Sequence, residues 1–157
     1  MEKTKEYKNL LLKEILIDFL FVISMVALIL LIDVVLGQLI DLYVKLGGKF
    51  IGTNLINESV SVRIVLASIL APIIESFLII GLINLSKKFI KSKFKYSLLV
   101  ALIFAALHYY SLIYILSVIP SAIIMVFSYT YYKPQKLSSF WILTLIHMIN
   151  NFVITMS

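Results

Sequence analysis

The sequence predicts an all-α membrane protein, a multi-pass transmembrane helix bundle. Hydrophobic residues make up 62% of its 157 residues, a larger share than soluble domains carry. Several apolar runs reach about 18 residues or more, the length needed to cross a hydrocarbon core roughly 30 Å thick. Short basic clusters separate these runs, as is typical of the ends of membrane spans. We predict about five spans in one transmembrane domain, residues 15–157, after a polar N-terminal segment, residues 1–14.

Each element follows from an apolar run or its interruption. The predicted spans are residues 15–36, residues 60–85, two short helices within residues 96–132, and residues 137–156. The turn between the two short helices is expected near residues 109–111, with Pro120 at a kink or a break of the second. Residues 37–59 are mixed, with an amphipathic interfacial helix expected in the first half and a loop in the rest. Residues 1–14 are expected to form a short interfacial helix or a frayed end.

The basic residues predict the orientation. The N-terminal segment and the loops after the second and fourth spans hold eleven of the fourteen Lys and Arg residues. By the positive-inside rule these segments, and the N-terminus with them, are cytoplasmic. The net charge of +6 therefore indicates contact with membrane lipid rather than with nucleic acid. The composition, rich in Ile, Lys and Asn, hints at a bacterial source and so at the cytoplasmic membrane of a bacterial cell.

Glu75, His108 and His147 are ionisable and lie in the interior of predicted spans, where such groups are costly. Glu75 is the only acidic residue after Glu58, and His108 and His147 are the only histidines. A carboxylate near the bilayer centre costs roughly 2.5–3.5 kcal/mol on insertion scales, so such a residue indicates a functional site. Asp18 and Asp33 lie in the first span, where we expect them to face headgroups or a neighbouring helix.

Spacing places these three residues in one layer. Glu75, His108 and His147 each lie eleven to thirteen residues from the nearest predicted cytoplasmic lysine. At 1.5 Å per residue this puts all three roughly 16–20 Å from the inner boundary. Asn151 follows His147 by four residues and shares its helix face. Because burying these groups separately in lipid would be expensive, we expect the four to meet near the midplane.

Such a cluster has recognisable chemistry. A carboxylate beside an imidazole can hold and deprotonate a water, while a second imidazole and an amide hold the oxyanion formed at a carbonyl. Glu75, His108 and His147 could instead bind zinc, since two histidines and a glutamate form a known catalytic set. The HExxH spacing is absent, however, and the chain has no cysteine, so the sequence gives no firm indication of a metal.

Three short motifs in residues 71–151 resemble those of a known family. Glu75 to Gly81 matches, in frame, a motif EExxxR followed by glycine; Phe104 to His108 matches FxxxH; His147 to Asn151 matches HxxxN. In this order they resemble the CPBP (CAAX protease and bacteriocin-processing, or Abi) intramembrane proteases. The second Glu and the Arg of the first motif are replaced by Ser76 and Ile80. Losing both charges together can be nearly neutral, whereas losing one costs about 3–5 kcal/mol.

The resemblance implies an intramembrane endopeptidase that hydrolyses a membrane-associated peptide or membrane-protein substrate. Glu75 and His108 would activate water, and His147 and Asn151 would stabilise the oxyanion. The missing Glu and Arg leave open a non-catalytic member of the family that binds a peptide or partner, for example in bacteriocin immunity. A proton-linked carrier is a third reading, but no internal repeat supports it.

Overall fold

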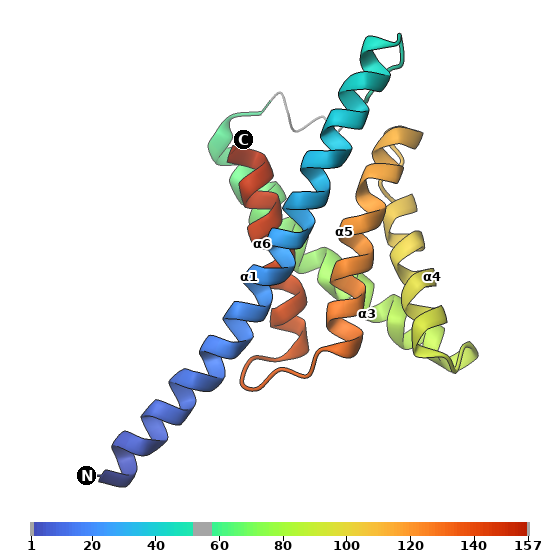
Figure 1. Ribbon diagram of the computed structural model, residues 1–157. Helices are drawn as coiled ribbons and strands as arrows, with labels where there is room; N and C mark the ends of the chain where they lie inside the picture. The colour runs from blue at the N-terminus through green and yellow to red at the C-terminus, as the bar shows by residue number, and fades with distance from the viewer. Residues whose placement is uncertain (1, 52–57, 157) are drawn as a thin grey trace.

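The protein is all-helical across the residues that its computed structural model describes, 2–51 and 58–156, with side chains described from residue 6 in the first range (Figure 1). The helices in chain order are α1 (Glu2–Lys45), α2 (Val60–Arg63), the π-helical segment η2 (Ile64–Leu70), α3 (Ala71–Phe89), α4 (Lys93–Ala106), α5 (Leu112–Tyr131) and α6 (Ser139–Met156). The predicted all-α, multi-pass bundle is confirmed. The orientation of the N-terminus stays a prediction.

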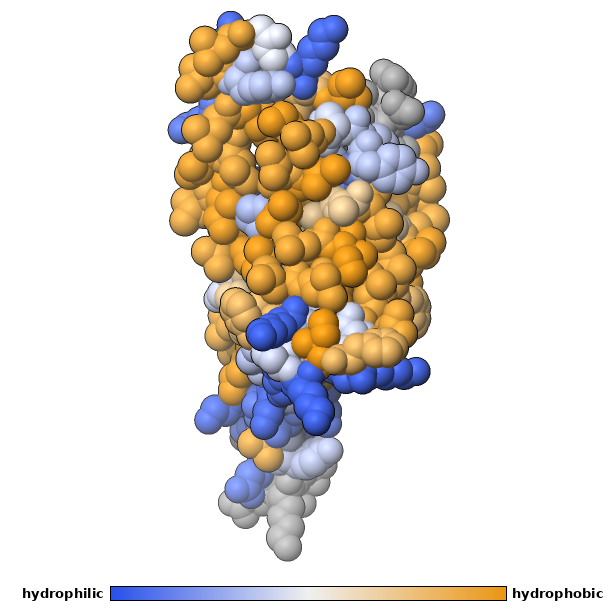
Figure 2. All heavy atoms as spheres, turned by 90° about the vertical axis from the view of Figure 1, so that its right-hand side faces the viewer, coloured by the Kyte–Doolittle hydropathy of each residue, from blue (hydrophilic) through white to orange (hydrophobic). Residues whose placement is uncertain are grey.

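Four of these helices are long and apolar enough to cross a membrane, within the described part of the chain. They are α1, the continuous segment from α2 to α3, α5 and α6. α4 has only 14 residues and rises about 21 Å, short of a roughly 30 Å core. The turn expected near residues 109–111 is present between α4 and α5, so α4 ends within the bundle. Figure 2 shows the broad apolar surface that results, with hydrophilic residues gathered mainly at one end.

α1 is longer than predicted. It runs without interruption for 44 residues, where we expected an N-terminal segment, a span and a separate interfacial helix. Gly37 was the expected end of the span, yet it lies inside the helix. A glycine in a helix interior costs only about 1 kcal/mol relative to alanine, which the flanking apolar residues offset. In Figure 1 the N-terminal part of α1 extends well beyond the other helices.

α4 and α5 begin at serine caps. The Ser92 hydroxyl accepts from the backbone N–H of Lys95, and the Ser111 hydroxyl accepts from that of Tyr114. These bonds satisfy N–H groups that lack helical partners. α5 then continues through Pro120 as one helix, so the alternative of a break there is wrong.

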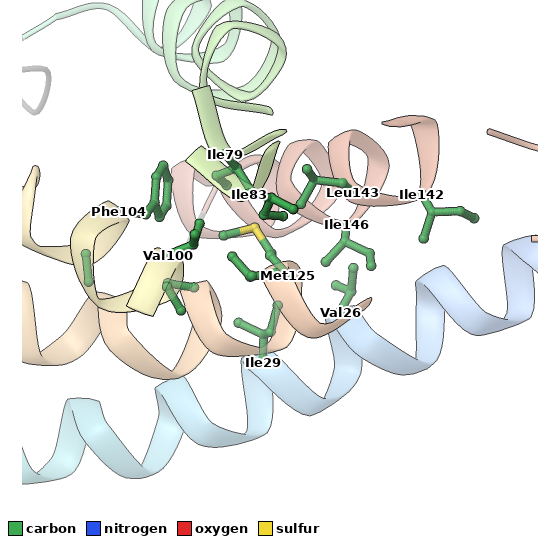
Figure 3. Close-up of a cluster of buried hydrophobic side chains, with 14 of the residues drawn as sticks. Val26, Ile29, Ile79, Ile83, Val100, Phe104, Met125, Ile142, Leu143 and Ile146 are labelled. Atoms are coloured by element: carbon green, nitrogen blue, oxygen red, sulfur yellow. The ribbon is translucent and has the colours of Figure 1, made fainter. Parts of the chain in front are cut away.

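The core lies where five helices meet. Figure 3 shows side chains from α1, α3, α4, α5 and α6 around Met125. Val22, Val26 and Ile29 are the α1 contribution, at the spacing of one helix face. The rest of α1 is largely exposed and apolar, as expected of a helix surrounded by lipid.

Asp18 joins α1 to the connection between α5 and α6. It is fully buried, and its carboxylate accepts four hydrogen bonds of 2.7–2.9 Å. The donors are the Tyr132 hydroxyl and the backbone N–H groups of Gln135, Lys136 and Leu137. Burial and the bond to Asp18 raise the pKa of Tyr132 to about 12, so the phenol remains a donor. The expectation that Asp18 faces headgroups or a neighbouring helix missed these partners, because they lie more than a hundred residues along the chain.

We predict that Asp18→Asn is strongly destabilising. Each carboxylate oxygen accepts two of the four bonds, so an N–H₂ group in place of either oxygen must face two donors with another donor. Hydrogen bonds to a charged group contribute about 1.5–3 kcal/mol each, and losing two should cost about 3 kcal/mol or more. Thermal unfolding in detergent would measure this. Asp41→Asn, an exposed change on the same helix, is the control and should leave the unfolding temperature unchanged.

Candidate active site in the membrane domain

A cavity of about 380 Å³ lies between α1, η2, α3, α5 and α6 and beside the end of α4. Glu75, His108, His147 and Asn151 all line it. The convergence inferred from the sequence is therefore present in the structure, and it brings residues of α3 and α6 together with His108, which follows α4. The chemical role of each residue stays a prediction.

Glu75 and His147 contact each other across the cavity. The Glu75 Oε2 atom lies 3.4 Å from His147 Nε2, and the side chains are 27% and 7% exposed, respectively. The distance is slightly longer than an ordinary hydrogen bond. The two atoms are close enough for an ion pair, and because a carboxylate only accepts, Nε2 is the ring nitrogen that carries the proton in such a pair. His147 Nδ1 is buried and has no hydrogen-bond partner among the described residues.

His108 lies just after the end of α4 and is held in one orientation. Its Nδ1 atom is 3.0 Å from the backbone carbonyl of Phe104. Because a carbonyl oxygen only accepts, Nδ1 carries the proton and a neutral ring keeps a lone pair on Nε2. The Phe104 ring packs edge-on against both imidazoles, with centroids 4.9 Å from His108 and 6.1 Å from His147. The Phe of FxxxH thus positions both histidines.

Asn151 is tied to the backbone of η2. Its Nδ2 atom donates to the Ala67 carbonyl at 2.8 Å. In this segment the N–H of Ala71 bonds the carbonyl of Leu66, five residues back. The same spacing would pair Ala67 with residue 72, which is proline and has no N–H. Asn151 therefore supplies the donor that Pro72 cannot, and Glu75 lies on the helix directly after this junction.

Several polar residues of the cavity, Asn150 and Asp33 among them, were not assigned to the site from sequence. From the sequence, Asn150 is expected to pack in the bundle or to be an alternative amide to Asn151. It is 5% exposed and lines the cavity, and its Oδ1 is unpartnered among the described residues. Its spacing of three from His147 was the available signal. Asp33 also lines the cavity, from α1. Its position in an apolar span indicated that burying its carboxylate costs free energy, but it did not indicate which group the carboxylate would lie near.

The two replaced motif positions are accommodated by neutral contacts. Ser76 is fully buried, and its hydroxyl accepts a 2.9 Å hydrogen bond from Thr144 of α6. Ile80 is partly buried against the core. No unpaired charge is left where the family pattern has a Glu and an Arg, as expected of two charges lost together.

A ready metal site is not formed. Across residues 6–51 and 58–156, no group of three or more His, Cys, Asp or Glu side chains is arranged to hold a metal ion. Glu75, His108 and His147, the set considered for zinc, share the cavity without converging on one point in this way.

Residues 57–153 match a family model described as type II CAAX prenyl endopeptidase Rce1-like. The match covers more than half of the chain. The chain belongs to the Rce1-like family. This confirms the resemblance drawn from the three motifs, all of which lie in the matched region. Neither the search of curated proteins nor the search of solved structures found a match.

The residues that line the cavity fall into two groups, those inside the family match and those of α1 outside it. Residues of the Rce1-like region, from η2 to α6, supply Glu75, both histidines and Asn151. α1 lies outside the matched residues and supplies another wall, which includes Asp33, Leu36 and Ile40. The protein is thus a CAAX-protease-type membrane protein whose cavity is completed by a helix beyond the family match.

We predict that Asn151 and Pro72 are coupled through Ala67. Asn151→Ala leaves the partly buried Ala67 carbonyl without its donor and should cost about 1 kcal/mol of stability. In a Pro72→Ala background residue 72 has an N–H that can bond Ala67, so the same change should cost clearly less. Unfolding of the two single variants and the double variant in detergent gives the coupling energy. Equal costs in both backgrounds would show that Asn151 does not compensate for the proline.

Proposed function

We propose that the protein is an intramembrane endopeptidase that hydrolyses a peptide bond with a water activated by Glu75 and His108. The observation that carries the proposal is the contact between Glu75 and His147 in a cavity that His108 and Asn151 also line. A carboxylate, two imidazoles and an amide around one space are the groups that acid–base hydrolysis of an amide requires. Membership of a family described as endopeptidases supports the same chemistry.

The steps follow from which atoms accept and donate. Glu75 takes a proton from the water molecule while the water oxygen attacks the carbonyl carbon. The Nε2 lone pair of His108 accepts a hydrogen bond from the other water hydrogen and so orients the water. The oxyanion of the tetrahedral intermediate accepts from the Nε2–H of His147 and from the second N–H of the Asn151 amide. Glu75 then passes its proton to the leaving nitrogen as the C–N bond breaks. The immediate products are a carboxylic acid and an amine, and the acid then gives its remaining proton, the one hydrogen-bonded to His108 Nε2, to the amine, which leaves a carboxylate and an ammonium group.

The substrate class follows from where the cavity lies. Its walls belong to helices with largely apolar outer surfaces, so a peptide reaches Glu75 from the membrane or its boundary. We propose a membrane-embedded or juxtamembrane peptide, cleaved in the cytoplasmic membrane of a bacterial cell. The side chains that could recognise its sequence line the cavity from α1 and α5.

A non-catalytic family member that binds a peptide or partner membrane protein, for example in bacteriocin immunity, is the second candidate. The engagement of Asn151 with Ala67 favours it, because an amide that supports the backbone is less free to follow a developing oxyanion. The neutral contact of Ser76 with Thr144 in place of charged motif residues points the same way. In this case binding would not need Glu75 as a base.

We predict that Glu75→Gln abolishes hydrolysis. General-base catalysis contributes about a hundredfold to ten-thousandfold, so turnover should fall by at least about a hundredfold. The purified chain would be reconstituted in liposomes with a library of single-span peptides, and the products identified by mass spectrometry. In water enriched in ¹⁸O, the new carboxylate should carry one heavy oxygen.

Asp41→Asn, exposed on α1 away from the cavity, should cleave the same peptides at the wild-type rate. Cleavage that persists in Glu75→Gln at the wild-type rate would refute the mechanism. If the wild-type protein and Glu75→Gln both bind the peptides and neither cleaves them, the non-catalytic candidate would be favoured.

A further inference from the structure

Among the described side chains of α1, Asp33 is the charged one that lines the cavity. It lies outside residues 57–153, so the family match assigns it no role. Leu36, Gly37 and Ile40 follow it on the same helix face and also line the cavity. Asp33 is therefore part of the wall that faces the Glu75 site, and its carboxylate is half-buried.

The carboxylate of Asp33 has no partner within the described ranges of the chain. No hydrogen bond or ion pair to it is present there, in contrast to Asp18 with its four donors. A carboxylate inside an apolar span is costly unless another group pairs with it. Gly37, one turn further on, leaves space beside it, since nothing lies within 4 Å of the position a Cβ would occupy.

The cavity around Asp33 suits a cation. Its described lining includes two carboxylates, Asp33 and Glu75, and neither lysine nor arginine. This contrasts with a chain whose net charge is +6. Tyr110 and Tyr114 line the same cavity with their rings 5.3 Å apart and edge-on, and aromatic rings add to the attraction of a cation. Asn150 brings a buried, unpartnered Oδ1, a further acceptor among the described groups.

We propose that Asp33 is the specificity residue of a subsite that binds a basic side chain, lysine or arginine, of the peptide substrate. This inference rests on the proposed function for its substrate, and it names the feature of the peptide that the cavity selects. The ammonium or guanidinium group pairs with Asp33, its methylene stem packs on Leu36 and Ile40, and the peptide bond extends toward Glu75. An acidic or carboxylate-terminated segment is disfavoured at the same place, because two carboxylates repel it.

Binding can be measured without cleavage. The Glu75→Gln protein in nanodiscs of neutral lipid would be titrated with fluorescent apolar peptides that differ only at one central residue: lysine, norleucine or glutamate. We expect the lysine peptide to bind about tenfold to a hundredfold more tightly than the norleucine peptide, the range of one charge-assisted hydrogen bond, and the glutamate peptide to bind least.

Adding Asp33→Asn should reduce the ratio of lysine-peptide to norleucine-peptide affinity to about one, while Asp33→Glu should restore part of that ratio. Asp41→Asn, an exposed carboxylate of the same helix, is the matched control and should keep the full preference. Size-exclusion profiles and unfolding temperatures of the variants show that each remains folded. A lysine preference that survives Asp33→Asn, equal affinities for lysine and norleucine, or no binding of the lysine peptide would each overturn the proposal.

The outcome is separable from that of the endopeptidase assay. If lysine-selective binding depends on Asp33 but no peptide is cleaved, the subsite stands and the proposed hydrolysis fails. If peptides are cleaved through Glu75 with no preference at the Asp33 position, hydrolysis stands and the subsite fails.

Discussion

A missing hydrogen-bond donor at Pro72 shapes the centre of this protein. The proline leaves the Ala67 carbonyl without a helical partner in a part of the chain surrounded by apolar residues, where an unsatisfied carbonyl is costly. The π-helical turn of η2 and the amide of Asn151 resolve this together. One consequence is that α6 is held against the turn that precedes Glu75. The position of Glu75 in the cavity therefore depends on the hydrogen bond between the Asn151 side chain and the Ala67 backbone carbonyl.

An unsatisfied polar group is costly among apolar residues, and this cost also explains how the other buried polar groups are paired. Asp18 takes its donors from a loop, Ser76 takes its donor from Thr144, and Glu75 meets His147. Each contact joins elements that are distant in sequence, so each also specifies how the helices pack. Asp33, half-buried in the cavity wall, lacks such a partner within the described part of the chain. That difference separates a group that stabilises the fold from one that is open to a ligand.

Much of the fold was predictable because lipid imposes length and polarity directly on the sequence. The apolar runs located α5 and α6, and the gap between α4 and α5 was placed near residues 109–111. The ends of α1 were not, because a glycine such as Gly37 breaks a helix only when the surroundings offer an alternative. The shortness of α4 was predicted from the length of the apolar run, but the contact of His108 with the Phe104 carbonyl at its end was not, because hydropathy does not report such local contacts.

The sequence by itself determined the class of protein, its family and the four residues that share a depth, since hydropathy, motif order and rise per residue are properties of one chain read in order. Only the tertiary structure decided what those residues touch. That Asn151 supports Ala67, that Glu75 meets His147 rather than His108, and that Asp33 shares their cavity all depend on how each helix is rotated about its axis. Rotation is set by packing between helices, and no single helix carries that information in its own sequence.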